Sequence, residues 1–446
     1  MAEYKNLCSH SINNLQSHEI LSKFVDLLNS FQIHTEMHQV NQVISICNLI
    51  CECLKEISRN FEIDDIIQNV KPQKYIKEIL CYVLDKDICN DEKQNDLSII
   101  LFMTLNLAQF SVLFNEIDFF TFMNDLAIKE LLHNNNQELL FDIIRCSIID
   151  SQDEQIDLFI NNKYYYYYLG FILKTSSYNL ESKGYKILNC FISKINYNNV
   201  IEDILEFLIH AQARQQKKCL ILKICLLILS RTLKIEADAF YFAQIIYKSD
   251  FYPKIFECLN RDSPNSVFGF RLLSKIYSVF PENDPPDLNA INWNNIKLFF
   301  NDVNDFLPDV LRFLSIIPFF GTGSIQDIIL SGLYNDVLYI FNDLNYQCRL
   351  QAIAFITTSV IKGSNSQVIK LFEIGVLPPL IEILECENDE SITKCVLNSI
   401  ERIWDVCCDN YYDEFNRIFV EHDGYDILLQ ISNCNKEAQS LSDKIG

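Results

Sequence analysis

Few residues in this chain have the types and spacing that chemistry requires. His34 and His38 stand four residues apart, which can place both on one helix face for zinc, but no Glu or Cys at a useful spacing completes such a site. Residues 321–324 read Gly-Thr-Gly-Ser without the Lys of a phosphate-binding loop, so we interpret them as a turn between helices. No Ser–His–Asp order and no paired-acid motif stands out. We therefore predict that the protein is not an enzyme and uses no metal and no cofactor.

The composition favours helices joined by short polar connections. The 446 residues include only 10 Gly and 10 Pro, well below the average usage of about 7% and 5%. Sheet proteins of this size need many turns that contain these residues. The chain also has 17 Cys and no signal-peptide pattern at its start. Cysteines such as Cys47, Cys51, Cys190 and Cys225 fall on apolar faces, where reduced Cys acts as a small buried hydrophobe. This usage predicts a reducing compartment, the cytoplasm or the nucleus.

The net charge of −22 narrows the choice of partner. A field of this sign repels nucleic acid and anionic lipid and attracts cationic ligands. The longest apolar run, residues 219–229, is interrupted by Lys223 and is shorter than the roughly 20 residues that span a bilayer. We expect neither nucleic acid nor a membrane as a partner. Two interpretations of the charge remain open, which are general solubility and a basic ligand.

One layout recurs along the chain: a long amphipathic helix, a polar break, a short helix and a further apolar helix. It is clearest in residues 347–386, where "CRLQAIAFITTSVIKG" ends at Gly363 and "SNSQVIKLFEIG" ends at Gly375. The next segment, "VLPPLIEILE", has Pro378 and Pro379 in its first turn, where a missing N–H costs nothing. Gly just past a helix end predicts a left-handed cap.

The long final helices of these segments can be superposed at positions 40 to 43 residues apart, which are Phe102, Asp142, Tyr185, Leu227, Phe270, Phe313, Ala354 and Leu397. Armadillo units have a period of about 40–47 residues. We therefore predict an all-α fold, a right-handed superhelical α-solenoid of about ten armadillo-type repeats with a concave groove. Residues 1–18 would form a short N-terminal tail and residues 19–446 a single armadillo-repeat solenoid.

The C-terminal part resembles a known family. The segments "LFEIGVLPPLIEILE", "VLNSIERI" and "FVEHDGYDILLQISNCNKEAQSLSDKI" between residues 368 and 445 are similar to the last two repeats of importin-α. That family consists of adaptors that bind basic nuclear localisation signals. The resemblance implies a groove that holds an extended basic peptide through Trp-x-x-x-Asn pairs on successive repeats. In such pairs the Asn amide binds the peptide backbone and the rings hold Lys and Arg stems.

This chain keeps that array only in part. Phe102 and Asn106 in "LFMTLNLA", and Tyr185 and Asn189 in "GYKILNC", retain the Asn and replace the Trp. Between them, Asp142 and Cys146 occupy the paired positions, while Asp150 stands where the family places a carboxylate for the key lysine. The resemblance thus assigns cargo-peptide binding to five residues, Phe102, Asn106, Asp150, Tyr185 and Asn189. The alternative is that Phe102 and Tyr185 are packed aromatics and that the two Asn occur by chance in an Asn-rich chain.

A second set of positions corresponds to the minor site of the family. The pairs there read Phe270/Ser274, Phe313/Ile317 and Ala354/Thr358, with no Asn among them. The family also begins with a basic arm that recruits importin-β, whereas residues 1–60 contain only Lys5, Lys23, Lys55 and Arg59 as basic residues. We therefore expect a weakened major site, no working minor site and no carrier step in the usual manner.

Two functions fit the sequence. The first is an importin-α-like adaptor, in cytoplasm and nucleus, that binds basic peptide segments of cargo proteins for import, with importin-β or an export factor as further partners. The second is an armadillo-repeat protein-interaction scaffold that has lost cargo binding. The charge along the groove-lining helices separates them, because only the first requires acidic residues there.

Overall fold

The structure is a computed structural model that describes most of the chain. The described residues are 17–36, 40–60, 76–77, 80–81, 91–108, 117–129, 132–149, 153–195, 198–212, 218–232, 236–261, 263, 265–282, 284–301, 304–387, 389–432 and 435–445. Within these ranges every regular element is a helix and no strand occurs. The chain forms two compact units, Met1–Ile204 and Leu205–Gly446. The tail predicted for residues 1–18 lies almost wholly outside the described residues, and the single solenoid predicted for 19–446 stays a prediction.

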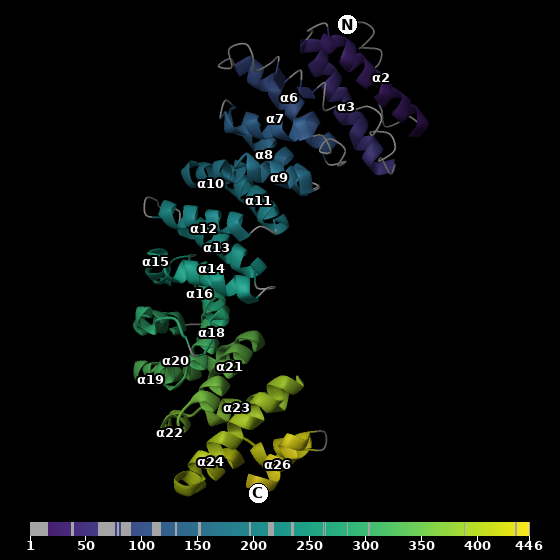
Figure 1. Ribbon diagram of the computed structural model, residues 1–446. Coiled ribbons are helices and arrows are strands. Elements are labelled where there is room, and N and C mark those ends of the chain that lie inside the picture. Colours follow the sequence, from purple (N-terminus) through teal and green to yellow (C-terminus); the bar gives the residue numbers. More distant parts are fainter. Residues whose placement is uncertain are drawn as a thin grey trace. The chain divides into compact units, whose positions relative to one another are not determined.

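Unit 1 consists of helices that follow one another along the chain (Figure 1). They are α2 (Ser17–Glu36), α3 (Val40–Asn60), α6 (Asp91–Ala108), α7 (Ile117–Ile128), α8 (Asn134–Ile149), α9 (Asp153–Asn161), α10 (Tyr164–Lys174) and α11 (Tyr178–Lys194). The boundary between the units falls inside α12 (Asn198–Gln212). The long helices α3, α6, α8 and α11 pack in that order.

Unit 2 also consists of helices that follow one another along the chain. Its α-helices are α13 (Lys218–Thr232), α14 (Glu236–Tyr247), α15 (Phe251–Glu257), α16 (Asn265–Val279), α17 (Trp293–Lys297), α18 (Leu307–Ile316), α19 (Thr322–Ser331), α20 (Leu333–Ile340), α21 (Tyr346–Lys362), α22 (Asn365–Ile374), α23 (Leu377–Cys386), α24 (Glu390–Glu421), α25 (Gly424–Ser432) and α26 (Lys436–Ile445). Short 3-10 turns are η3 (Leu288–Ala290), η4 (Leu298–Phe300), η5 (Ile317–Phe320) and η6 (Phe341–Asp343). Helices α13, α16, α18, α21 and α24 pack in that order.

Helices α21, α22 and α23 begin and end at capping residues that the sequence predicts. The Asn345 side chain accepts the Cys348 N–H at 2.9 Å and starts α21. Ser364 donates its backbone N–H to Gln367 Oε1 at 3.0 Å at the start of α22. Gly375 has φ 98° and ends that helix with the predicted left-handed cap, and Pro378 lies in the first turn of α23. The helices predicted for residues 347–386 are thus confirmed.

Gly363 corrects one detail of that prediction. Its φ is −72° and its ψ 151°, so it is extended and not left-handed. A Cβ at this position would lie 2.7 Å from the Ser359 carbonyl oxygen. The glycine is therefore required by the close approach of the chain to the last turn of α21, and not by the sign of φ.

The five consecutive tyrosines at residues 164–168 form the first turns of α10. Tyr164, Tyr165 and Tyr168 are buried, while the two between them are half-buried. Tyr164 donates its hydroxyl to Asp125 at 2.8 Å, and Tyr168 donates to Asn124 Oδ1 at 2.9 Å. Burial raises the pKa of Tyr168 well above its ordinary value. The three buried tyrosines thus pack in the core between repeats, and each of their hydroxyl groups has a hydrogen-bond acceptor.

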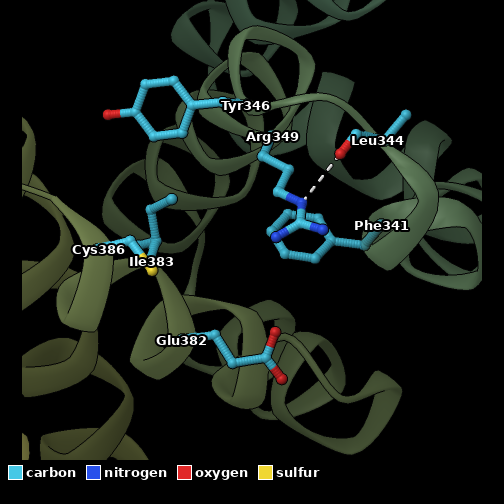
Figure 2. Close-up of a pocket in the computed structure, with 7 residues that line it drawn as sticks. All are labelled: Phe341, Leu344, Tyr346, Arg349, Glu382, Ile383 and Cys386. Atoms are coloured by element: carbon cyan, nitrogen blue, oxygen red, sulfur yellow. Dashed lines mark hydrogen bonds between the residues drawn. The ribbon is translucent and has the colours of Figure 1, made fainter.

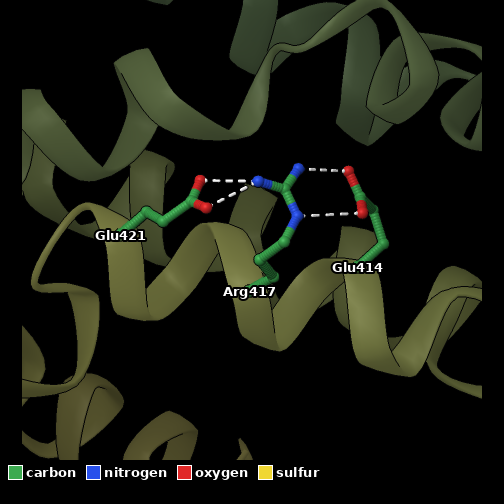
Figure 3. A network of polar contacts seen from close by, with 3 residues as sticks. All are labelled: Glu414, Arg417 and Glu421. Atoms are coloured by element: carbon green, nitrogen blue, oxygen red, sulfur yellow. Dashed lines mark hydrogen bonds and ion pairs between the residues drawn. The ribbon is translucent and has the colours of Figure 1, made fainter.

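The C-terminal end of unit 2 consists of α24, α25 and α26. Helix α24 is broken at Tyr411, whose φ of −128° is not helical. Beyond that break Arg417 binds two carboxylates of its own helix, Glu414 at 2.7 Å and Glu421 at 2.6 Å, as Figure 3 shows. These pairs raise the pKa of Arg417 and lower that of Glu414. All three side chains are about half exposed, so the network supports this short helix at the surface and makes no site.

The described cysteines are free thiols. Cys47 and Cys225 are fully buried, as the sequence predicts, and burial raises the pKa of Cys225 to about 12. Cys190 is half-buried, and the side chain of Cys51 lies outside the described residues. Among the helices that the structure describes, none is both long and apolar enough to cross a bilayer. The described side chains also include no group of three or more His, Cys, Asp or Glu that could hold a metal ion.

Candidate protein-interaction surface

The last helix of each repeat packs against its equivalents in the neighbouring repeats, which leaves one stripe of its surface uncovered. These third helices are α6, α8 and α11 in unit 1, and α13, α16, α18, α21 and the first part of α24 in unit 2. We call the uncovered stripe the third-helix face. Because a helix turns by about 100° per residue, side chains at i, i+3, i+4 and i+7 share such a stripe. Any ligand of these repeats that lies across several helices would touch this face.

In α6 and α8 the third-helix face has the register that the sequence predicts. Phe102 of α6 is 43% exposed, although its neighbours Leu101 and Met103 are buried. In α8, Asp142 and Cys146 are half-buried between fully buried apolar residues. Asn106 belongs to α6, but its side chain lies outside the described residues, as does the whole of Asp150. The structure therefore places Phe102 on the face and leaves two of the five predicted site residues undescribed.

In α11 the predicted pair lies at the edge of the face. Tyr185 and Asn189 are half-buried, and burial raises the pKa of the Tyr185 hydroxyl. The side chain that is fully exposed between them is Lys186. One residue along a helix is a rotation of about 100°, so Lys186 presents its ammonium group to solvent while Tyr185 turns partly toward the core. The binding role assigned to Tyr185 and Asn189 stays a prediction.

Cations of α11 lie against the acids of α8. Lys183 forms an ion pair with Asp142 and a longer one, at 3.8 Å, with Glu138. Lys194 donates its ammonium group to the Ile149 carbonyl oxygen at the end of α8. The side chains of Lys183, Asp142 and Glu138 are each about one-quarter exposed. The acid that occupies a paired position of the predicted array is thus already neutralised by the next repeat.

The register predicted for the second set of positions is wrong in α16 and α18. Phe270 and Phe313 are fully buried, and Ser274 and Ile317 are buried beside them. The exposed residues are those one position away, Arg271 in α16 and Arg312 in α18. A period that varies between 40 and 43 residues leaves the register uncertain by one residue, and an error of one residue turns a side chain by about 100° from solvent into the core. In α21 the register holds, with Ala354 and Thr358 half-buried on the face.

The corrected register reveals a sorting of charge that the sequence analysis missed. Helices α13, α16, α18 and α21 together contain eight Lys and Arg residues and one acid, Asp309. The whole chain has 37 Lys and Arg against 59 Asp and Glu, so these helices have the opposite balance. The signal was present in the sequence, but it appears only when charges are summed helix by helix instead of over the whole chain.

A small cavity of about 300 Å³ lies away from this face, between α21, α23 and the connection that precedes α21 (Figure 2). It is lined by Phe341, Leu344, Tyr346, Arg349, Glu382, Ile383 and Cys386. Arg349 lies over the Phe341 ring, with Cζ 5.8 Å from the centroid, and donates to the carbonyl oxygens of Asn342 and Leu344 at 2.6 and 3.1 Å. Its guanidinium is thus engaged within the chain.

Comparison with known proteins identifies the fold. No protein-family model matches the sequence, and no curated protein does. The crystal structure of an engineered protein aligns with a TM-score of 0.63 at 13% identity, over 96% of this chain and 98% of that one. Two designed armadillo repeat proteins, the second in complex with the peptide (KR)4, each align over 54% of this chain at TM-scores of 0.43 and 0.41, with 16% and 15% identity and 98% and 97% of their own length. The described helices and the first of these alignments show the predicted fold class, an all-α solenoid of helical repeats.

Proposed function

We propose that the protein is an interaction scaffold that binds an extended polypeptide segment across its third-helix face. The observation that carries this proposal is the recurrence of exposed or half-buried side chains at corresponding positions of successive packed helices, including Phe102 and Asp142 in unit 1 and Arg271, Arg312 and Ala354 in unit 2. Rigid helices hold these side chains in fixed positions, so a ligand that touches several of them meets a preorganised surface.

The spacing of packed helices suits an extended segment. Neighbouring helix axes lie about 8–10 Å apart, and an extended chain advances about 3.3 Å per residue. A segment that crosses the helices therefore meets a new helix about every third residue. A continuous backbone can use this regular spacing along a whole unit, whereas a compact small molecule would touch only one or two repeats.

Filling the face at its centre is expected to abolish peptide binding in unit 2. Ala354→Trp adds a ring at a half-buried position on α21 that faces away from the core, so it should block a segment without unfolding the helix. Asn335→Trp on α20 is the matched control, because Asn335 is exposed on a second helix of the same repeat. Peptides selected from a random 12-residue display library on the full chain should lose at least tenfold in affinity for Ala354→Trp and less than twofold for the control. A set of selected peptides that binds all three proteins equally would rule out this face.

A second candidate function is the one implied by the importin-α resemblance. In this proposal unit 1 binds basic nuclear localisation signals of cargo proteins through Phe102, Asn106, Asp150, Tyr185 and Asn189. The protein would then act in nuclear import in cytoplasm and nucleus, with importin-β or an export factor as further partners. The exposed ring of Phe102 supports it, because an aromatic face can hold the stem and head of a lysine.

The charges around that site weaken the second candidate. A basic peptide would have to compete with Lys183 for Asp142 and Glu138, and it would pass the exposed ammonium group of Lys186. Each like-charge approach opposes binding, and a pair that already exists must be broken first. The general scaffold requires no such exchange, which is why we place it first.

A titration separates the two candidates. A lysine-rich signal peptide is added to the wild type, to Asn106→Ala/Asn189→Ala and to Asn161→Ala/Asn335→Ala, which removes two exposed amides outside the third helices. Loss of backbone hydrogen bonds at about 1–2 kcal/mol for each Asn predicts at least tenfold weaker binding for the first double variant alone. Equal affinity of all three proteins would remove Asn106 and Asn189 from the explanation and leave the general scaffold.

A further inference from the structure

The third-helix face of unit 2 carries positive charge at its centre. Lys223 of α13, Arg271 and Lys275 of α16 and Arg312 of α18 are uncovered or half-covered on three helices that pack in succession. We call these four residues the basic stripe. Phe268 of α16 and Ile316 of α18 are half-buried on the same helices, and Phe319 in η5, just after α18, is 43% exposed with Lys362 Nζ 5.8 Å from its ring centroid. The basic stripe therefore combines positive charge with apolar surface that a ligand can contact.

Two of the four cations are partly engaged within the fold. Lys223 Nζ lies 4.7 Å from the centroid of the Phe268 ring, which holds it between α13 and α16. Arg271 Nε donates to Asp309 Oδ1 at 2.8 Å, and the Asp309 side chain is only 7% exposed while that of Arg271 is 48% exposed. Arg271 thus neutralises a buried carboxylate and still presents half of its surface to solvent.

The other two cations of the basic stripe are Lys275 and Arg312. Within the described part of the chain, no carboxylate lies at ion-pair distance from Lys275 or Arg312. In a protein with 59 acidic residues, we expect most exposed cations to have acidic neighbours. The helices that bear the stripe instead hold one acid, and that acid is buried. The positive charge of Lys275 and Arg312 is therefore local, and it is opposite in sign to the net charge of −22 of the whole chain.

From this arrangement we propose that the basic stripe binds an acidic, extended polypeptide segment, with carboxylates on Arg312 and Lys275 and apolar side chains against Phe268 and Phe319. The inference deepens the proposed scaffold function by naming the chemistry of its ligand. A guanidinium group can bind a carboxylate through two parallel hydrogen bonds, and an ammonium group adds a point charge. A nucleic acid would meet the same cations, but the net charge of −22 repels a polyanion with a charge at every unit along its backbone.

The helix spacing sets the expected pattern of acids. Lys275 and Arg271 are one turn apart on α16, and Arg312 lies on the next third helix. With helix axes about 8–10 Å apart and about 3.3 Å per extended residue, carboxylates at every third position would fall on successive helices. The direct probe is therefore a labelled 12-residue peptide with the sequence (ESG)4, compared with (QSG)4 and (KSG)4.

The experiment measures fluorescence anisotropy with the full chain at low and moderate salt. Lys275→Glu/Arg312→Glu should weaken the binding of (ESG)4 at least tenfold. Lys248→Glu/Lys254→Glu makes the same change in net charge at the end of α14 and in α15 of the same unit and should weaken it less than threefold, because neither lysine lies on a third helix. Arg271 is left unchanged, since it neutralises Asp309. If the reversed charges reduce helicity, Lys275→Gln/Arg312→Gln replaces them, with an expected loss of at least threefold.

Several results would overturn the acidic-segment proposal. They are equal affinity for (ESG)4 and (QSG)4, equal losses in the two charge-reversed variants, tighter binding of a 12-nucleotide oligo-dT than of (ESG)4, and no detectable binding of (ESG)4 to the wild type. Each of these leaves the general scaffold standing if display-selected peptides still lose affinity for Ala354→Trp. The experiments thus distinguish an error in the proposed ligand chemistry from an error in the proposed binding face.

Discussion

Phe313→Ala is expected to destabilise unit 2 by about 3–5 kcal/mol, the range found for removal of a fully buried ring. The Phe313 ring is fully buried, with its centroid 5.8 Å from that of Phe270 and 5.5 Å from that of Tyr277. These contacts join α16 to α18, and in a repeat protein each interface between neighbours supplies much of the stability of both. Urea unfolding of the full chain, with hydrogen exchange read out in α16 and α18, measures the effect.

Arg312→Ala provides the matched control at the adjacent position. Arg312 is exposed, so its truncation should change the free energy of unfolding by no more than about 0.5 kcal/mol. The pair tests the register directly, because the sequence-based assignment put Phe313 on the binding face. Comparable stability of the two variants would mean that Phe313 is not in the core, and the register of α18 described above would be wrong.

Gly184→Val is expected to destabilise unit 1 by about 2–3 kcal/mol, a typical cost of overpacking. A Cβ on Gly184 would lie 2.4 Å from Ile172 Cγ2 of α10 and 3.6 Å from Phe141 Cε2 of α8. The glycine therefore lets α11 approach two helices at once, and two added methyl groups have no room beside the packed Ile172. Thermal unfolding of the variant, followed by circular dichroism, should show the loss.

Gly170→Ala should have the opposite sign. Gly170 lies inside α10, and a Cβ there would meet no atom within 4 Å. Alanine is favoured over glycine in a helix interior by about 0.5–1 kcal/mol, so this variant should be slightly more stable than the wild type. If both glycine substitutions raised the melting temperature, the close approach at Gly184 would not constrain the fold.

The two units differ in what their third-helix faces offer to a ligand. In unit 1, acids of α8 are paired with cations of α11, and Phe102 stands exposed nearby. In unit 2, no carboxylate among the described residues lies at ion-pair distance from Lys275 or Arg312, and Phe268 and Ile316 are half-buried on the same two helices. If both proposed ligands bind, the basic segment would contact unit 1 and the acidic segment unit 2. Binding tests with the full chain and face-specific variants can assign each ligand to its unit.

Helix ends and the repeat were open to prediction from the residues alone. Caps act over a few neighbouring residues, so Pro378 at the start of α23 and Gly375 at the end of α22 could be recognised in the sequence. The helices of residues 347–386 follow from the same local signals. The all-α repeat fold also follows, because a period near 42 residues survives errors of one or two positions.

The amino-acid sequence by itself determined the helices, the repeat and the negative charge of this protein. Only the tertiary structure decided that Arg271 and Arg312 face solvent while Phe270 and Phe313 fill the core, and that Lys183 neutralises Asp142. The physical reason is that a helix rotates by about 100° per residue, so the side chain at one position faces solvent or core according to how the neighbouring helices pack. Local propensity specifies that a helix forms, whereas packing between repeats specifies which of its sides remains for a partner.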